Sequence, residues 1–260
     1  MKPHFKQIVI VILSIFLLSC NSDDSASKNP ITPTLPVTPP ATQVPTTQVP
    51  TTPINNSIKY LALGDSYTIG QSVCETCRFP EQLKSNLKSI YPQTDFSLKI
   101  IATTGWTTSN LISAINSQNP DSNYDLVTLL IGVNNQFQRI DFSVYQKEFP
   151  ELLTKAISLA KGDKKNVIVL SIPDYAYTPF AANYSEANRT KISNEIDQYN
   201  TFAENTCINK GVTFISITDI TRQGLSNSSL VASDGLHPSE LAYKMFIGRI
   251  FPQVKMILQD

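Results

Sequence analysis

The chain has very little histidine, few cysteines and no excess of charge of either sign. Among its 260 residues there are two histidines, His4 and His237, which excludes a histidine-rich metal cage. Lys plus Arg and Asp plus Glu each number 21, so the charge balance favours neither nucleic acid nor anionic lipid as a partner. Four cysteines are too few for a disulfide scaffold. Because we expect His4 to be removed with the N-terminal segment, any imidazole chemistry in the folded domain must use His237.

An apolar run near the N-terminus is too short to cross a membrane. It extends from Ile8 to Leu18, is interrupted only by Ser14, and follows two lysines. As a helix these residues would measure about 16 Å, about half of a hydrocarbon core of about 30 Å. The pattern is typical of a secretory signal, and its end at Leu17-Leu18-Ser19-Cys20 resembles a bacterial lipobox. We therefore expect residues 1–19 to be removed and Cys20 to carry lipid, as in an exported lipoprotein anchored to a membrane that the sequence does not identify.

The next stretch has the composition of a spacer. Of the 24 residues from Pro30 to Pro53, eight are Pro and eight are Thr, with no Gly and no charged side chain. Such a segment buries too little apolar surface to offset the entropy lost on ordering. We interpret residues 20–56 as a lipidated cysteine followed by a linker, although a Pro-rich ligand for a peptide-binding domain is an alternative. Residues 57–260 then form one domain of ordinary size.

Apolar runs alternate with helical spacings along this domain. Strands are expected at 58–63, 96–102, 126–131, 167–172 and 212–217, and helices at 80–91, 108–116, 144–160, 187–209 and 239–258. This alternation predicts an α/β sheet covered by helices on both faces. In such folds functional groups lie in loops beyond the carboxyl ends of the strands. The polar residues that follow the expected strands are therefore the first candidates for chemistry.

Ser66 follows the first expected strand, in Gly64-Asp65-Ser66, where its hydroxyl could act as a nucleophile. The tripeptide alone is weak evidence for a nucleophile, because turns and helix caps favour the same residues. The loop before the last expected helix adds Asp234, three residues before His237. An Asp at this spacing can accept the Nδ1 proton of the histidine and leave Nε2 free to take a hydroxyl proton. The alternative for His237 is a hydrogen-bonded loop histidine.

A serine nucleophile also needs hydrogen-bond donors for the oxyanion that forms on the attacked carbonyl. Gly105, after the second strand, can offer a backbone N–H, and Asn134, after the third, can offer its side-chain amide. The N–H of Ser66 would be a third donor. Each position also has a plain structural interpretation, Gly105 as a turn residue and Asn134 as a turn or cap.

Together these motifs resemble the four sequence blocks of the SGNH/GDSL hydrolase family. The blocks stand in the family's order over nearly the whole domain: Gly64-Asp65-Ser66, Gly105, Gly132-Val133-Asn134-Asn135 and Asp234-Gly235-Leu236-His237-Pro238. The resemblance implies Ser66 as nucleophile, His237 as base, Asp234 as its orienting group, and Ser66, Gly105 and Asn134 as oxyanion donors. It also implies a flavodoxin-like three-layer α/β/α fold with a five-stranded parallel sheet in the order 2-1-3-4-5, and neither metal nor cofactor.

One residue departs from the family pattern, and rival hydrolase motifs are incomplete. The family usually has Asp where Asn135 stands, which puts the hydrogen bonding of that loop in doubt rather than the triad. Thr68 replaces the second Gly of a Gly-x-Ser-x-Gly elbow. Ser85-x-x-Lys88 has the spacing of penicillin-binding proteins but falls within an expected helix and lacks its partner motifs, so we interpret it as a solvated face.

The remaining cysteines and an aromatic loop leave alternatives open. For Cys74 and Cys77 we expect a disulfide that stiffens the loop after Ser66, the alternatives being an inert reduced pair, a redox pair or half of a zinc site. Cys207 is expected to be a buried thiol. After the fourth strand a loop carries three aromatic residues that could form a substrate wall or pack over the sheet: Tyr175, Tyr177 and Phe180.

The sequence therefore predicts an exported, lipid-anchored serine ester hydrolase that acts through an acyl-enzyme on Ser66. Its substrates would be short acyl or O-acetyl esters, with acetylated carbohydrate as the favoured class. A lipase- or lysophospholipase-like acyl hydrolase is the runner-up, and a non-catalytic carbohydrate-binding lipoprotein is the rival from another class. The sequence does not determine the oligomeric state.

Overall fold

Five strands form one parallel sheet in the computed structural model, which describes residues 55–259. The expected signal segment, Cys20 and the Pro- and Thr-rich stretch from Pro30 to Pro53 lie outside the described residues. The strands are β1 (Ser57–Gly64), β2 (Asp95–Ala102), β3 (Leu126–Leu130), β4 (Val167–Leu170) and β5 (Thr213–Ile215). Their order is β2-β1-β3-β4-β5, and all neighbours pair in parallel. The predicted sheet and strand order are confirmed.

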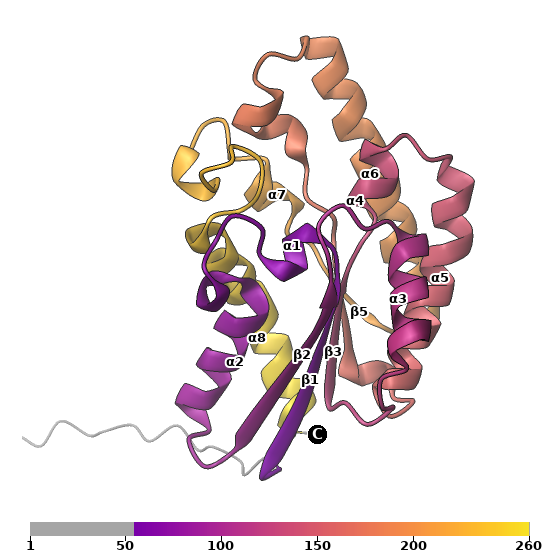
Figure 1. Cartoon of the computed structure of the whole chain (residues 1–260), viewed down its shortest axis with the longest axis vertical. Coiled ribbons are helices and arrows are strands. Elements are labelled where there is room, and N and C mark those ends of the chain that lie inside the picture. Colours follow the sequence, from indigo (N-terminus) through magenta and orange to yellow (C-terminus); the bar gives the residue numbers. More distant parts are fainter. Residues whose placement is uncertain (1–54, 260) are drawn as a thin grey trace, which may run out of the picture. The chain divides into compact units, whose positions relative to one another are not determined.

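Helices cover both faces of this sheet (Figure 1). Helices α2 and α8 pack together on one face, whereas α3, α5 and α6 lie on the other (Figure 1). The helices are α1 (Ser66–Ile69), α2 (Phe79–Ile90), α3 (Thr108–Gln118), α4 (Val133–Phe137), α5 (Phe142–Leu159), α6 (Glu186–Lys210), α7 (Thr218–Thr221) and α8 (Glu240–Gln259). Short 3₁₀ turns occur at Glu75–Cys77, Lys164–Asn166, Tyr175–Tyr177, Pro179–Ala181 and Ser228–Leu230. Within residues 55–259, no helix has the length and apolar character needed to cross a bilayer.

The central strands are buried on both faces. Every residue of β3 and of β4 is buried, as expected for parallel strands between two helical layers. The one polar side chain of β3, Thr128, is satisfied because its hydroxyl lies 2.8 Å from the hydroxyl of the equally buried Tyr60 on β1. The core therefore fixes β1 and β3 to one another with side-chain as well as backbone hydrogen bonds.

The last two strands are shorter than their apolar runs predicted. Strand β4 ends at Leu170 although the run continues to Ile172. There the backbone leaves the sheet because the side chain of Asn200, on α6, binds both polar groups of Ile172: its Oδ1 accepts from the N–H at 2.7 Å and its Nδ2 donates to the carbonyl at 3.2 Å. Helix α4 was not predicted, since a helix of five residues leaves no periodic pattern.

The register of the sheet aligns the ends of three strands. Gly64, at the end of β1, pairs with Ala102 of β2 and with Leu130 of β3. Ser66, Gly105 and Asn134 then follow these three residues within the next four positions. Because the strands are parallel, the loops that carry these candidates leave the same edge of the sheet, close to α1 and α4 (Figure 1).

Gly64 lies at a point of close approach that only glycine fits. A Cβ atom there would lie 2.1 Å from Thr68 Oγ1 and 2.5 Å from the Leu130 carbonyl oxygen. We therefore expect Gly64→Ala to lower the free energy of unfolding by about 1–3 kcal/mol, because α1 or β3 must move. Urea denaturation measures the change.

Gly248→Ala is the matched control for this substitution. Gly248 lies exposed within α8, where an added Cβ meets nothing within 4 Å, so alanine should raise the free energy of unfolding by about 0.5–1 kcal/mol. Equal urea midpoints for Gly64→Ala and the wild type would contradict the close approach.

Candidate active site

Ser66 is the first residue of α1, immediately after β1. The turn is held by Asp65, whose Oδ1 accepts a hydrogen bond from the Tyr67 N–H at 3.0 Å, and the helix ends at Gly70 in the left-handed conformation (φ 76°). Ser66 is 3% exposed, at the sheet edge shared with the other candidates. Its position after a buried strand is thus set by a capping side chain on one side and a glycine stop on the other.

Asp234 holds His237 at two points. Its Oδ2 lies 2.6 Å from the imidazole Nδ1, and its Oδ1 accepts from the N–H groups of His237 at 3.0 Å and Leu236 at 2.9 Å. A carboxylate facing Nδ1 favours the tautomer that is protonated there, which leaves Nε2 as a proton acceptor. Partial burial raises the pKa of Asp234, but hydrogen bonds from the Ser72 hydroxyl, these two N–H groups and the imidazole outweigh it and hold the pKa well below its usual range.

Tyr67 joins the serine loop to the histidine loop. Its ring lies with its centroid 5.0 Å from that of His237, and its carbonyl oxygen accepts from the hydroxyl of Tyr243, on α8, at 2.9 Å. Since Tyr67 follows Ser66 directly, this packing brings the serine loop against the histidine loop. Within residues 55–259 no hydrogen bond joins the Ser66 and His237 side chains. Such bonds are often long in ligand-free sites and tighten when substrate binds.

Gly105 and Asn134, two of the three expected oxyanion donors, follow strand ends that are aligned in the sheet. The Asn134 side chain donates from Nδ2 to the Trp106 carbonyl at 3.0 Å. It also donates to Asp65 Oδ2, at 3.4 Å, and this longer hydrogen bond is the weaker of the two. Gly105 has φ 83°, in the left-handed region, and a Cβ built on it would meet nothing within 4 Å. The Gln138 side chain secures this turn by donating to the Gly105 carbonyl at 3.0 Å.

Asp65 is a fully buried carboxyl group directly beside Ser66. Burial raises its pKa to about 7, although the hydrogen bonds from the Tyr67 N–H and the Asn134 amide act in the opposite direction. Burial therefore favours the neutral form of this carboxyl relative to an exposed aspartate. Its contact with Asn134 couples the capping residue of the serine loop to the side chain expected to bind the oxyanion.

Asn135, the departure from the family pattern, is well satisfied. It is fully buried, its Oδ1 accepts from the Thr108 N–H at 3.0 Å, and its Nδ2 donates to the Thr108 hydroxyl at 2.7 Å. The Thr108 hydroxyl in turn donates to Glu148, on α5. The amide thus maintains the hydrogen bonding of its loop, which the sequence left in doubt.

Ser72 is a residue of the site that the sequence did not reveal. Its hydroxyl donates to Asp234 Oδ2 at 2.7 Å, the same oxygen that faces the His237 imidazole. Ser72 is held in the left-handed region (φ 65°), which is uncommon for a residue with a side chain. Because Ser72 and Asp234 are 162 residues apart, no local pattern could have paired them.

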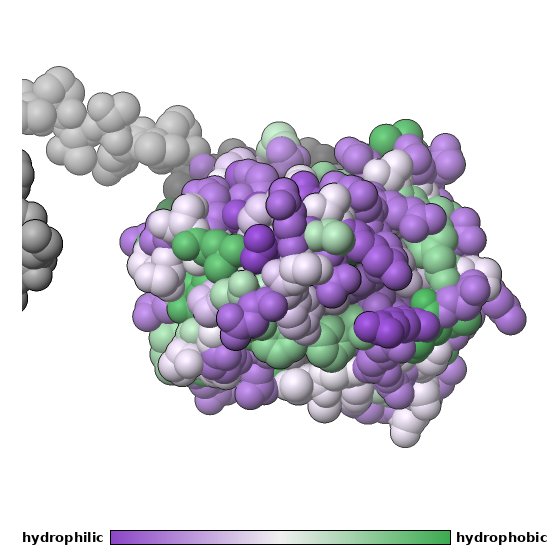
Figure 2. All heavy atoms as spheres, turned by 90° about the horizontal axis from the view of Figure 1, so that it is seen from above, coloured by the Kyte–Doolittle hydropathy of each residue, from purple (hydrophilic) through white to green (hydrophobic). Residues whose placement is uncertain are grey.

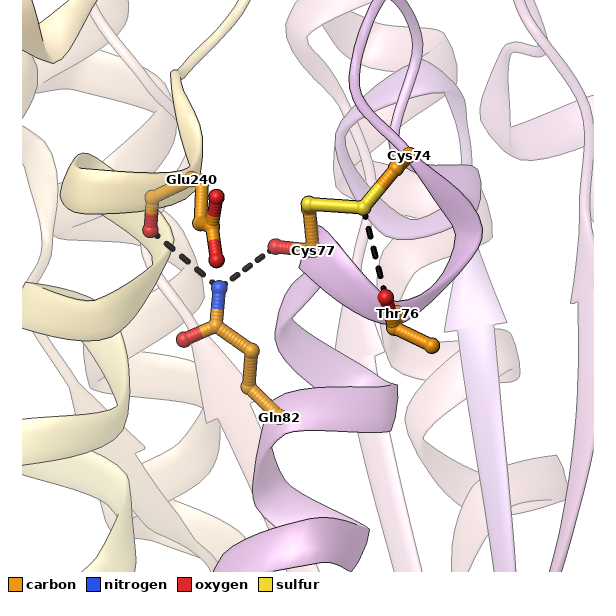
Figure 3. The surroundings of a disulfide bond; sticks show 5 residues. All are labelled: Cys74, Thr76, Cys77, Gln82 and Glu240. Carbon is orange, nitrogen blue, oxygen red and sulfur yellow. Dashed lines mark hydrogen bonds between the residues drawn. A yellow bond between two sulfur atoms is a disulfide. The ribbon is translucent and has the colours of Figure 1, made fainter.

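A disulfide joins Cys74 to Cys77 in the loop between α1 and α2, two residues after Ser72. Figure 3 shows that Gln82, on α2, donates from Nε2 both to the Cys77 carbonyl and to that of Glu240, the latter at 3.2 Å, which ties this loop to the start of α8. These links hold the Ser72 hydroxyl close to Asp234. Cys207 is a buried free thiol on α6, and burial raises its pKa to about 12.

The aromatic loop after β4 is attached to the histidine loop. The Phe180 N–H donates to the Gly235 carbonyl at 2.8 Å, between Asp234 and His237 in sequence. Tyr175 is buried and borders a small cavity that also contacts His237, while Phe180 is exposed. Tyr177 is exposed too, but it is not among the residues that line this cavity. Tyr175 is therefore packed into the fold, whereas Phe180 is exposed next to the histidine loop, and the role of these residues as a substrate wall stays a prediction.

The face that carries these residues is chemically mixed. Seen from above, towards the carboxyl ends of the strands, it is mostly hydrophilic with separate hydrophobic areas (Figure 2). Within residues 55–259, no group of three or more His, Cys, Asp or Glu side chains is arranged to hold a metal ion. What the arrangement does offer is a hydroxyl, an oriented imidazole and amide donors along one edge.

Comparisons with known proteins agree with this arrangement. The model of the GDSL-like lipase/acylhydrolase family matches residues 62–245. Similar solved structures include a lipase/acylhydrolase from Enterococcus faecalis (TM-score 0.58, 16% identity, covering 77% of this chain and 97% of that one). Also similar is an acetylxylan esterase from Geobacillus stearothermophilus (TM-score 0.54, 18% identity, covering 77% of this chain and 95% of that one). A psychrotrophic esterase from Pseudoalteromonas sp. is similar as well (TM-score 0.54, 16% identity, covering 79% of this chain and 100% of that one). At these identities the structures establish a shared fold. No curated protein matches the sequence significantly.

The contact between Ser72 and Asp234 can be tested without straining the backbone. Ser72→Gly removes the hydroxyl but suits the left-handed conformation, so folding should be maintained. We expect kcat/KM for p-nitrophenyl acetate to fall by about 10-fold, equivalent to about 1.4 kcal/mol, because Asp234 orients His237 less well. Steady-state kinetics measure this.

Asn119→Gly is the control, since it places glycine at another left-handed residue, the exposed C-terminal cap of α3. Its activity should equal that of the wild type. Unchanged kcat/KM in Ser72→Gly would show that this hydroxyl does not support the Asp234–His237 pair.

Proposed function

The chain belongs to the GDSL-like lipase/acylhydrolase family, and on this basis we propose that it is an exported, lipid-anchored serine hydrolase of short acyl esters, in particular O-acetyl esters of carbohydrate. The observation that carries the proposal is the Asp234–His237 pair, with 2.6 Å between Oδ2 and Nδ1, packed against the residue that follows Ser66. An oriented imidazole next to a serine at a strand end is the arrangement that acyl transfer requires.

In the proposed reaction the Ser66 hydroxyl attacks the ester carbonyl carbon while His237 Nε2 takes its proton. The oxyanion of the tetrahedral intermediate accepts hydrogen bonds from the N–H groups of Ser66 and Gly105 and from the Asn134 amide. Collapse breaks the bond to the alcohol, which leaves with the proton from His237. Water, deprotonated by the same imidazole, then hydrolyses the acyl-Ser66 ester and regenerates the serine.

Asn134 can serve as a donor at little cost. Its stronger hydrogen bond, 3.0 Å to the Trp106 carbonyl, fixes the side chain, whereas the 3.4 Å contact with Asp65 is weak enough to be exchanged for the oxyanion. An oxyanion at normal hydrogen-bond distance would bind the amide more strongly than the long contact with Asp65 does, so the exchange favours the transition state over the ground state.

The cavity beside His237 is small. It is lined by Tyr67, Tyr175, Leu236 and other residues and has a volume of about 10 Å³. It is too small to hold a long acyl chain, which favours a short acyl group. The similarity in fold to an acetylxylan esterase is compatible with an O-acetyl substrate.

The anchor is proposed from sequence, because Cys20 lies outside the described residues. We expect Cys20→Ser to move the protein from the membrane fraction to the soluble fraction of the cells that express it, since in this proposal the lipid on Cys20 holds it there. Fractionation followed by immunoblotting measures the shift. Retention of Cys20→Ser in the membrane fraction would contradict lipidation at this residue.

The catalytic assignment predicts graded losses of activity. On p-nitrophenyl acetate we expect Ser66→Ala and His237→Ala to lower kcat by up to about 10⁶-fold, and Asn134→Ala by about 10²–10³-fold. Ser85→Ala is the control, because Ser85 lies on the exposed face of α2 and should not affect turnover. Wild-type activity in His237→Ala would contradict the proposed mechanism.

A further inference from the structure

A pocket of about 570 Å³ lies between α4 and α6, next to the candidate active site. Its volume is within the range of about 300–1,000 Å³ that is typical of small-molecule sites. Tyr175 lines both this pocket and the small cavity at His237. Helix α4 contributes Gln136 and Phe137 to the pocket, and the same helix carries Asn134. The pocket is therefore linked to the candidate site through Tyr175 and through the helix that carries the expected oxyanion donor.

Aromatic rings form one wall of the pocket. Phe137 and Tyr184 line it and are 46% and 36% exposed. Phe180 lies between them, with ring centroids 6.1 Å from Phe137 and 6.0 Å from Tyr184, and Tyr175 supports Phe137 edge-on at 5.5 Å. The rings are thus held in place by one another, and three of them, Phe137, Tyr175 and Tyr184, line the pocket. Exposed rings that are already fixed by their neighbours offer apolar faces to a ligand and lose little conformational entropy on binding.

Polar side chains also line the pocket, and several of them are paired. Gln136 donates from Nε2 to Glu195 Oε2 at 2.8 Å, and Lys191 Nζ lies 3.8 Å from Glu195 Oε1. Arg139 and Asn188 add further hydrogen-bond donors to the lining. An acyl chain in this pocket would remove water from these charged and amide groups without replacing its hydrogen bonds, which is costly. A ligand with both an apolar face and several hydroxyl groups can pack on the aromatic rings and form hydrogen bonds with the polar side chains.

We infer that this pocket binds the sugar of an O-acylated carbohydrate while its ester group lies at Ser66. The C–H face of a pyranose ring packs on Phe137 or Tyr184, and its hydroxyl groups bond to Glu195 and the neighbouring donors. The inference rests on the proposed function and adds the part of the substrate that the catalytic residues do not contact. It assigns specificity for the alcohol side of the ester to α4 and α6.

The test compares two acetyl esters that share the acyl group and differ in the alcohol, O-acetylated xylo-oligosaccharide and p-nitrophenyl acetate. Glu195→Gln maintains the shape of the side chain but removes its charge, and Tyr184→Ala removes a ring from the rim. In each variant the ratio of kcat/KM for the oligosaccharide to that for p-nitrophenyl acetate should fall by about 10-fold, mainly through KM. Glu204→Gln, an exposed acid on the same helix outside the pocket, should maintain the wild-type ratio.

A binding measurement accompanies the kinetics. Deacetylated xylo-oligosaccharide should inhibit wild-type hydrolysis of p-nitrophenyl acetate competitively, with an inhibition constant about 10-fold higher in Glu195→Gln. If the ratio of the two kcat/KM values is the same in the wild type and in both variants, the assignment of the pocket to the sugar is wrong. The proposal that the protein hydrolyses esters would still stand. A wild-type protein that hydrolyses neither ester would instead contradict the proposed function.

Discussion

The parallel pairing of β1 with both β2 and β3 is the constraint on which the site depends. It places Gly64, Ala102 and Leu130 in one row, so that the loops after them leave together. The backbone hydrogen bonds of the sheet bring Ser66, Gly105 and Asn134 to one edge, and no contact among these residues is needed for this. The Asp234–His237 loop is then joined to this edge through the packing of Tyr67 on the imidazole. A rigid sheet thereby positions groups that lie on short loops.

Much of this arrangement follows from local patterns in the sequence. The apolar runs located all five strands, because fully buried parallel strands are almost continuously apolar. Asp234 and His237 were paired correctly from their spacing, since a carboxylate three residues before an imidazole can reach Nδ1 within one turn. The strand order, by contrast, came from the resemblance to a family, because apolar runs specify strands but not their neighbours.

What could not be predicted depends on contacts between distant segments. The bond of Ser72 to Asp234 needs the loop after α1 to meet the loop before α8. The end of β4 at Leu170 needs Asn200 of α6 to bind the backbone of Ile172. The pocket between α4 and α6 likewise involves a helix too short to leave a periodic signal. In each case a polar side chain or a short element acts across the fold, where sequence periodicity carries no information.

The central claim is that Ser66 is the nucleophile, and covalent labelling tests it most directly. The protein is incubated with a fluorophosphonate, which phosphonylates activated serines, and the modified peptide is then identified by mass spectrometry. The account predicts one adduct per chain, on Ser66, formed in parallel with the loss of esterase activity and absent from the protein that lacks the His237 imidazole. An adduct on another residue, or full inactivation with Ser66 unmodified, would contradict it.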